Sequence, residues 1–149
     1  MSAGVASALP LLYALDVILR RRYPRAQVGW DVEYTDEFEA WWDTLTIEEQ
    51  ERVSAAVELL EERGPNLGRP IVDRIAGSSV HNLKELRPSA TNIRILFAFG
   101  PVRSAILLLG GDKTRQWQRW YVEAIPVAER LLAEYLEDLR REGEEREPG

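Results

Sequence analysis

The chain has 149 residues, of which 45% are hydrophobic and 30% are charged, so it can bury one core but is too short for two independent domains. It contains no cysteine and one histidine, which excludes disulfides, thiolate chemistry and the usual zinc sites. The formal net charge of -6 argues at first sight against a nucleic-acid partner.

The first expected element is an amphipathic helix over residues 8–22. Asp16 interrupts its apolar run, no basic region precedes it, and it is shorter than the ~20 residues that cross a membrane. We therefore expect a cytoplasmic protein with no signal peptide and no membrane contact. Residues 1–28 are expected to be a mainly helical extension that packs on the domain or on a partner.

A strand and two helices are expected next. Residues 30–34 alternate apolar and acidic side chains, as a half-buried strand does. Residues 36–45 carry apolar side chains at helical spacing. Thr46 and Glu49 match a capping box that opens a second helix, and Gly64–Pro65 ends it. The short link predicts an antiparallel helix hairpin with its acidic residues facing solvent.

The second half of the chain is expected to form a meander and a C-terminal helix. Residues 66–78 are rich in Gly and Pro and predict a loop. Three strands joined by antiparallel hairpins are expected over residues 80–87, 92–99 and 103–109. Ile125–Pro126 is expected to start a helix, with Pro126 at its first position. Residues 142–149 are expected to be a disordered acidic tail.

These elements predict an α+β fold in which the helix hairpin packs on a small antiparallel twisted sheet in two layers. The compact domain is expected to span residues 29–141, between the extension and the tail.

Charge is distributed unevenly along this domain. Residues 31–62 hold twelve acids and one base, whereas residues 66–121 hold nine bases and three acids. A polyanion responds to the local field and not to the net charge. One half of the molecule is therefore suited to contact phosphate.

Arg94 is the first candidate site residue. Alternation places Ile93, Ile95 and the two following odd positions in the core, so Arg94 faces the opposite side of the sheet, away from the helix hairpin. An anion could meet it there, or a cross-strand carboxylate such as Glu85 could pair with it. The same alternation places Lys84 on one face of its strand and Glu85 and Arg87 on the other.

Residues 110–121 are the densest site candidate. They place Lys113, Arg115 and Arg119 among Trp117, Trp120 and Tyr121 directly after a strand. Cations hold phosphates and aromatic rings stack on unpaired bases, a combination typical of single-stranded RNA binding. The alternative is that the tryptophans pack against the domain edge and the arginines remain solvated.

Other chemistries find little support in the sequence. No pattern of His, Cys or paired carboxylates predicts a metal site, and no cofactor is expected. Gly110–Gly111 lacks the further residues of a phosphate-binding loop. His81 can be a solvated strand residue or a base.

Three segments together resemble HigB-type toxins of the phage-derived branch of the RelE/ParE superfamily. They are residues 68–87, with NLKELR at their end, residues 94–99 (RILFAF), and residues 107–132, which contain GGDKTRQWQRWY. The resemblance extends over about residues 30–136 and leaves the N-terminal 28 residues outside.

This resemblance implies the toxin of a type II toxin–antitoxin system, a metal-independent and ribosome-dependent mRNA endoribonuclease. A helix-turn-helix antitoxin would bind and neutralise it. The ribose 2′-hydroxyl would attack the adjacent phosphate, which needs a base, a cation for the phosphorane and an acid.

Site residues carry over from the family by position. The resemblance assigns Arg94 to the phosphorane, Lys113 and Arg115 to the basic positions after the last strand, and Tyr121 to the late aromatic position. Lys84 is the candidate base, and Arg87 falls near a further basic position. The RNA-binding candidates are Arg87, Arg115, Trp117, Arg119, Trp120 and His81.

Two other functions stay open. ParE relatives of this fold inhibit DNA gyrase by binding and carry no nuclease centre. The chain could also be an inactive relative that only binds its antitoxin. Arg94, Lys113 and Tyr121 favour the enzyme, whereas the acidic helices and a pI near 5.0 favour protein contacts.

Overall fold

The computed structural model describes residues 5–7, 29–76, 78, 82–112, 114 and 117–146. The elements in these residues follow one another as β1 (Val5–Ser7), β2 (Asp31–Thr35), α3 (Asp36–Trp42), α4 (Ile47–Arg63), the 3-10 turn η1 (Gly64–Asn66), β3 (Val72–Arg74), β4 (Leu83–Leu86), β5 (Ile93–Gly100), β6 (Ser104–Asp112) and α5 (Trp117–Arg146). The α+β class expected from the sequence is confirmed.

The sheet is mixed, which corrects the expectation of a purely antiparallel one. Its order is β1-β2-β6-β5-β4-β3, and β2 lies parallel to β6 while every other pair is antiparallel. The meander β4-β5-β6 was predicted correctly. The helices between β2 and the meander form a crossover long enough for β2 to pair in parallel with β6.

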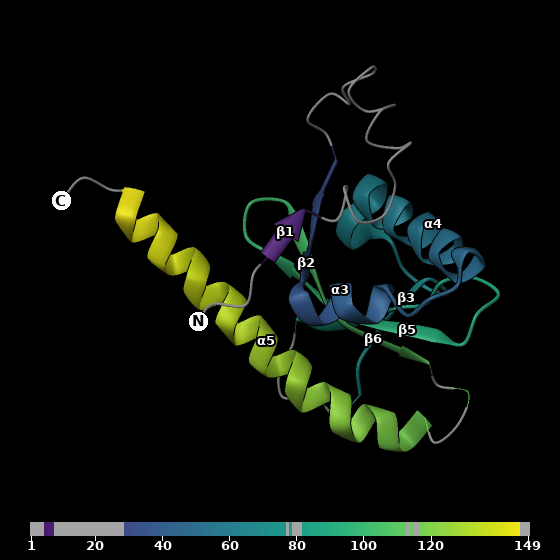
Figure 1. Cartoon of the computed structure of the whole chain (residues 1–149). Helices are drawn as coiled ribbons and strands as arrows, with labels where there is room; N and C mark the ends of the chain where they lie inside the picture. Colours follow the sequence, from purple (N-terminus) through teal and green to yellow (C-terminus); the bar gives the residue numbers. More distant parts are fainter. Residues whose placement is uncertain are drawn as a thin grey trace.

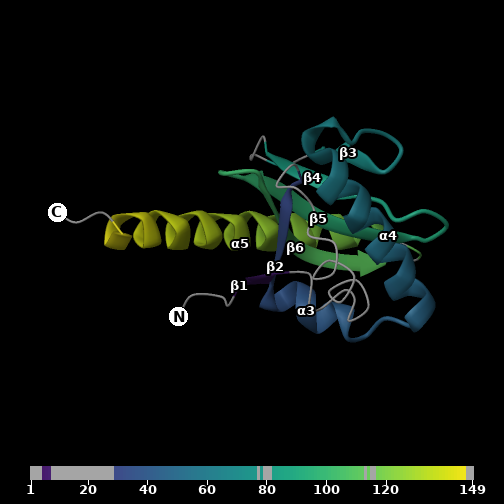
Figure 2. The ribbon, with the colours of Figure 1, turned by 90° about the horizontal axis from the view of Figure 1, so that it is seen from above.

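Helices cover both faces of the sheet, so the fold has three layers and not two. Figures 1 and 2 show α3 and α4 on one side and α5 on the other. The reason is that β5 and β6 are apolar on both faces, as strands of a doubly covered sheet are. One core lies under α3 and α4 and includes Ile95 and Phe97. The other lies under α5 and includes Leu96 and Leu108.

The two helices of the first layer begin where the sequence predicts. The Thr35 hydroxyl accepts a hydrogen bond from the Phe38 N–H and caps α3. Thr46 and Glu49 form a complete capping box at the start of α4. The helices fold back on the same side of the sheet and diverge from their short link (Figure 2).

Helix α5 is much longer than expected. It begins at Trp117 and contains Pro126 in its interior, so the prediction of a start at Ile125–Pro126 was wrong. Pro126 and Val122, four residues earlier, are both exposed, which lets water satisfy the carbonyl that proline leaves without a partner.

The far end of α5 is also helical beyond the expected boundary. It reaches Arg146, five residues into the tail predicted to be disordered. Arg140 pairs with Glu137 and Glu144, and Arg141 pairs with Glu137. Such pairs, three and four residues apart, stabilise an exposed helix.

The remaining predictions concern the loop and the N-terminal segment. The predicted loop over residues 66–78 contains the short strand β3. The sequence did not predict this strand because the Gly and Pro residues around it are typical of a loop. Residues 5–7 form β1 and pair with β2, whereas the helix predicted over residues 8–22 lies outside the described residues. None of the described helices is long and apolar enough to span a bilayer.

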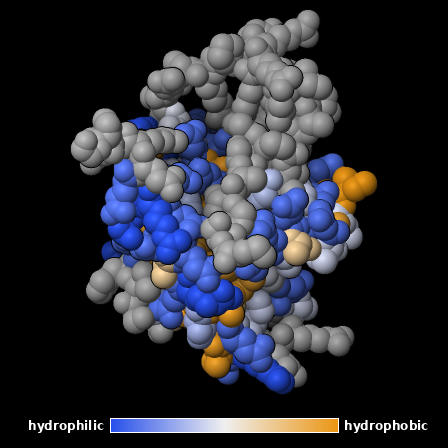
Figure 3. Space-filling view, turned by 60° about the vertical axis from the view of Figure 1, so that its left-hand side comes forward, coloured by the Kyte–Doolittle hydropathy of each residue, from blue (hydrophilic) through white to orange (hydrophobic). Residues whose placement is uncertain are grey.

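On the face shown in Figure 3, the surface of the described residues is mainly hydrophilic. Figure 3 shows hydrophobic side chains as isolated groups on one face. Among the described residues, the exposed large apolar side chains are Ile47, Val102, Val122 and Leu136. Such scattered residues are normal for a folded domain.

Gly110 and Gly111 lie near the end of the central strand β6, and an indole ring packs against each of them. A Cβ at Gly110 would be 2.3 Å from Trp41, and one at Gly111 would be 2.2 Å from the Trp120 ring. Trp41 belongs to the core under α3 and α4, and Trp120 to the core under α5. The glycine pair therefore lets both layers approach the sheet.

We expect Gly110→Ala to lower the free energy of unfolding by about 1–3 kcal/mol, because the methyl group would overlap the Trp41 ring. Urea unfolding monitored by tryptophan fluorescence measures this. Gly68→Ala is the matched control, since no atom lies within 4 Å of its Cβ position, and should change stability by less than ~0.5 kcal/mol. Equal stability of the two variants would contradict this account of the glycine pair.

Candidate functional site

A buried carboxylate, Glu85, lies at the centre of the polar cluster on the α5 side of the sheet. It comes from β4, is 2% exposed, and shares its face with the α5 core residue Leu83. Its carboxylate meets Arg87, Arg94 and Tyr121. These four residues are hereafter called the Glu85 cluster.

Arg94 contacts Glu85 from the neighbouring strand β5. Its Nε lies 3.6 Å from Glu85 Oε1, and its Nη1 donates a 2.8 Å hydrogen bond to the Ile93 carbonyl. The residue is 8% exposed, and its buried Nε has no hydrogen-bond partner. Of the two possibilities left open by the sequence, the structure contains the cross-strand ion pair. Arg94 faces away from the helix hairpin, as expected, but this face is covered by α5.

Arg87 links Glu85 to the edge of the sheet. Its Nε donates to Glu85 Oε2 at 3.0 Å, and its Nη2 lies 2.9 Å from the same oxygen. Nη2 is also 3.4 Å from Asp73 Oδ2 in β3. Since 35% of the Arg87 side chain is exposed, this guanidinium is the accessible cation of the cluster.

Tyr121 brings α5 to the cluster. Its hydroxyl donates a hydrogen bond to Glu85 Oε1, and its ring meets that of Trp120 edge-on, with centroids 4.9 Å apart. Burial, and then the hydrogen bond to Glu85, raise the pKa of Tyr121 above its ordinary value. The hydroxyl is therefore a donor over a wide pH range.

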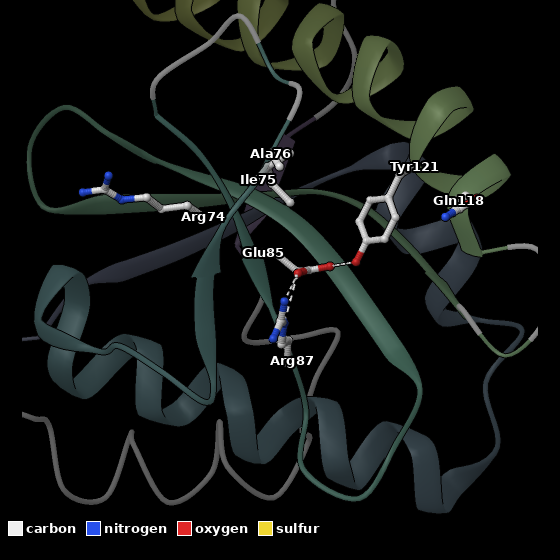
Figure 4. Close-up of a pocket in the computed structure, with 7 residues that line it drawn as sticks. All are labelled: Arg74, Ile75, Ala76, Glu85, Arg87, Gln118 and Tyr121. Carbon is white, nitrogen blue, oxygen red and sulfur yellow. Dashed lines mark hydrogen bonds and ion pairs between the residues drawn. The ribbon is translucent and has the colours of Figure 1, made fainter.

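The cluster forms one wall of a cavity of about 480 Å³. The cavity is lined by Arg74, Ile75, Ala76, Glu85, Arg87, Gln118 and Tyr121. Figure 4 shows Glu85 between Arg87 and Tyr121, while the Arg74 side chain extends away from them. Arg94 is not part of this lining and contacts Glu85 from within the protein. An anion entering here would first meet Arg87 and Tyr121.

Lys84 lies on the other side of the sheet from Arg94. It neighbours Glu85 in β4, pairs with Phe97, and lines a separate cavity with Arg69 and Arg74. The structure therefore does not bring the predicted base and the predicted phosphorane ligand together, because adjacent strand residues point to opposite faces.

The aromatic and basic segment is described in part. Arg119 is exposed and pairs with Glu123 along α5, and Trp120 packs on the α5 core over Gly111, as the packing alternative expected. Lys113, Arg115 and His81 lie outside the described residues, and so does the side chain of Trp117. Their predicted roles stay predictions.

Sequence reasoning underrated Glu85, which was considered only as a partner for Arg94. The signal was present in the strand alternation, since Glu85 and Arg87 share a face. The pairing of Leu86 with Ile95 then places Arg87 beside Arg94. Among the described residues, no three His, Cys, Asp or Glu side chains gather as metal ligands would.

Comparisons with known proteins point to one family. Residues 40–133 match the model of the family described as phage-derived protein Gp49-like. A Mycobacterium tuberculosis protein named "Putative toxin HigB3" is 52% identical over 98 residues, which is 66% of this chain and 86% of that protein. From the same organism, "Putative toxin HigB2" is 44% identical over 128 residues, 82% of this chain. The chain spans 63% of the length of this second relative. The resemblance to HigB-type toxins is confirmed.

We expect Glu85→Gln to destabilise the protein by about 3–5 kcal/mol, because it leaves the buried Arg94 guanidinium without a counter-charge. The double variant Glu85→Gln/Arg94→Met should regain much of this loss, since it removes both buried charges. Urea unfolding of the two single variants and the double variant measures the coupling. Additive losses would show that the pair does not interact.

We expect the free energy of unfolding to fall as the pH rises above about 10. The raised pKa of Tyr121 means that the folded state keeps this proton while an unfolded tyrosine, with a pKa of about 10, releases it. The contribution is complete below that pH and is lost above it. Tyr121→Phe should reduce the alkaline fall, which denaturant unfolding at a series of pH values measures. An identical fall in the variant would contradict the assignment.

Proposed function

The chain belongs to the phage-derived Gp49-like family, and on this basis we propose that it is the toxin of a type II toxin–antitoxin system. We propose further that it is a metal-independent endoribonuclease that cuts mRNA on the ribosome, and that a helix-turn-helix antitoxin neutralises it. The observation that carries the enzymatic proposal is the Glu85 cluster. It places a carboxylate, a guanidinium group and a hydroxyl at one cavity, with the Arg94 guanidinium behind the carboxylate.

These groups match what cleavage by a 2′-hydroxyl requires. The carboxylate of Glu85 would accept the 2′-hydroxyl proton as the new bond to phosphorus forms. The guanidinium of Arg87 would hold the charged phosphorane oxygens. As the bond from phosphorus to the 5′-oxygen breaks, that oxygen would take up the proton accepted by Glu85, relayed through water, and the products would be a cyclic phosphate and a 5′-hydroxyl.

The other two residues of the Glu85 cluster, Arg94 and Tyr121, would have different roles because only Tyr121 lines the cavity. Arg94 contacts Glu85 from behind the cavity, so it is a positioning residue that orients the carboxylate. The Tyr121 hydroxyl already occupies Glu85 Oε1, where the substrate hydroxyl would need to bind. Substrate would therefore displace this hydrogen bond, after which the Tyr121 hydroxyl can face the reacting phosphate.

The proposed general base is therefore Glu85 and not Lys84, the residue predicted from the sequence. Lys84 lies across the sheet from Arg94 and would need a second route to the substrate. A carboxylate is also a better acceptor at neutral pH than an ammonium group, which has no lone pair to offer.

We expect induced expression of the chain to stop growth and to cut translated mRNA at codon boundaries. Arg94→Ala and Lys113→Ala should relieve both effects, the latter as the resemblance implies. Glu85→Gln/Arg94→Met should also abolish cleavage. Because this double variant is expected to be more stable than Glu85→Gln, a loss of cleavage in it would not be explained by unfolding. Primer extension on ribosome-bound mRNA measures cleavage.

The control for these variants is Tyr135→Phe, which changes a buried polar contact of α5 away from the cavity. Tyr135 makes an equivalent hydrogen bond to Glu33 on the same side of the sheet but outside the cavity, so cleavage should persist. Growth arrest with intact mRNA and altered DNA supercoiling would instead support gyrase inhibition, as in ParE relatives. Absence of any growth effect would favour an inactive, antitoxin-binding relative.

A further inference from the structure

Two cations face each other across the last strand pair of the sheet. Arg74 in β3 is the direct partner of Lys84 in β4, and both side chains lie on the face covered by α4. Like charges directly opposite in an antiparallel pair repel each other. Neither has an ion pair with a described residue. This arrangement gains stability when an anion binds between them.

The cations open into a cavity of about 470 Å³ that is distinct from the one at Glu85. Arg69 and Asp73 also line it. Asp73 is already engaged, since its Oδ1 accepts hydrogen bonds from Arg69 Nε and the Arg74 N–H and its Oδ2 lies 3.4 Å from Arg87. Three cations and one occupied carboxylate leave the cavity electropositive.

The location makes this cavity reachable from outside. β3 is the outer strand of the sheet that the structure describes, so no described strand covers the cations from the side. Arg69 is largely exposed, with 80% of its side chain accessible. Arg74 lines both this cavity and the one at Glu85, and the two are therefore adjacent around the edge of the sheet.

We propose that Arg74 and Lys84 bind a phosphodiester of single-stranded RNA next to the scissile one, a contact that rests on the proposed nuclease function. RNA carries one negative charge per nucleotide. It can therefore contact Arg74 and Lys84 on one face of the sheet and Arg87 on the other, because the edge strand β3 is only three residues long. An acidic peptide could neutralise Arg74 and Lys84, but its carboxylates offer no proton to the Glu85 carboxylate, whereas the ribose 2′-hydroxyl of RNA does. RNA is therefore the better match to the two adjacent cavities.

The test compares two variants that lose the same charge. Arg74→Gln/Lys84→Gln removes the proposed contact, and Arg52→Gln/Arg130→Gln removes two exposed cations of α4 and α5. The probe is a fluorescent single-stranded RNA with 2′-O-methyl riboses, which binds but cannot be cut. Its affinity for the full chain is measured over a series of salt concentrations.

We expect the slope of log affinity against log salt to fall by about 0.7 in Arg74→Gln/Lys84→Gln, because the variant loses one phosphate contact of a single strand. The control should keep the wild-type slope. The urea midpoint of Arg74→Gln/Lys84→Gln should not decrease, since a repulsive pair is removed; a purely structural role would lower it.

Each outcome bears on one of the two proposals. Equal slopes in both variants would overturn the RNA contact, even if the wild-type chain cuts mRNA. The expected slope change without any cleavage of unmethylated mRNA would end the nuclease proposal and keep the contact. Loss of antitoxin binding with unchanged RNA binding would reassign the pair to the antitoxin and overturn the inference.

Discussion

The buried Glu85 carboxylate determines how the second half of the fold is assembled. It connects its own strand β4 with β5 through Arg94, with β3 through Arg87 and Asp73, and with α5 through Tyr121. A carboxylate this deep is unfavourable unless cations and donors surround it. The cluster is therefore formed only when all these elements are in place, which couples the geometry of the cavity to the completed fold.

Helix α5 is fixed on the sheet by two equivalent contacts. Tyr121 donates to Glu85 and Tyr135 donates to Glu33 of β2. Fourteen residues separate the tyrosines, close to four helical turns, so both hydroxyls point to the same face. Apolar residues between them, including Ala128 and Leu131, fill the α5 core. Two directional bonds with packing between them set both the position and the rotation of α5.

Local patterns in the sequence predicted the elements that depend on local interactions. The capping box at Thr46 and the meander follow from short-range rules, and both were correct. The long-range features were missed: the parallel β2–β6 pair, the third layer and the role of Glu85 need contacts between distant segments. The start of α5 was predicted at Pro126 because proline is common at the first position of a helix. In the structure, the packing of α5 on the sheet outweighs this local preference.

The contrast between net charge and local charge is explained by where the elements lie in the sheet. The acidic residues belong mainly to β2, α3 and α4, whereas β3 and β4 place Arg74, Lys84 and Arg87 at the opposite edge. Exposed charges separated by more than about 10 Å are largely screened from each other in salt. A polyanion at the β3 edge therefore responds mainly to the charges nearest to it, among them Arg74, Lys84 and Arg87. A net charge of -6 then opposes non-specific association with nucleic acid and still permits a phosphate contact at this one edge.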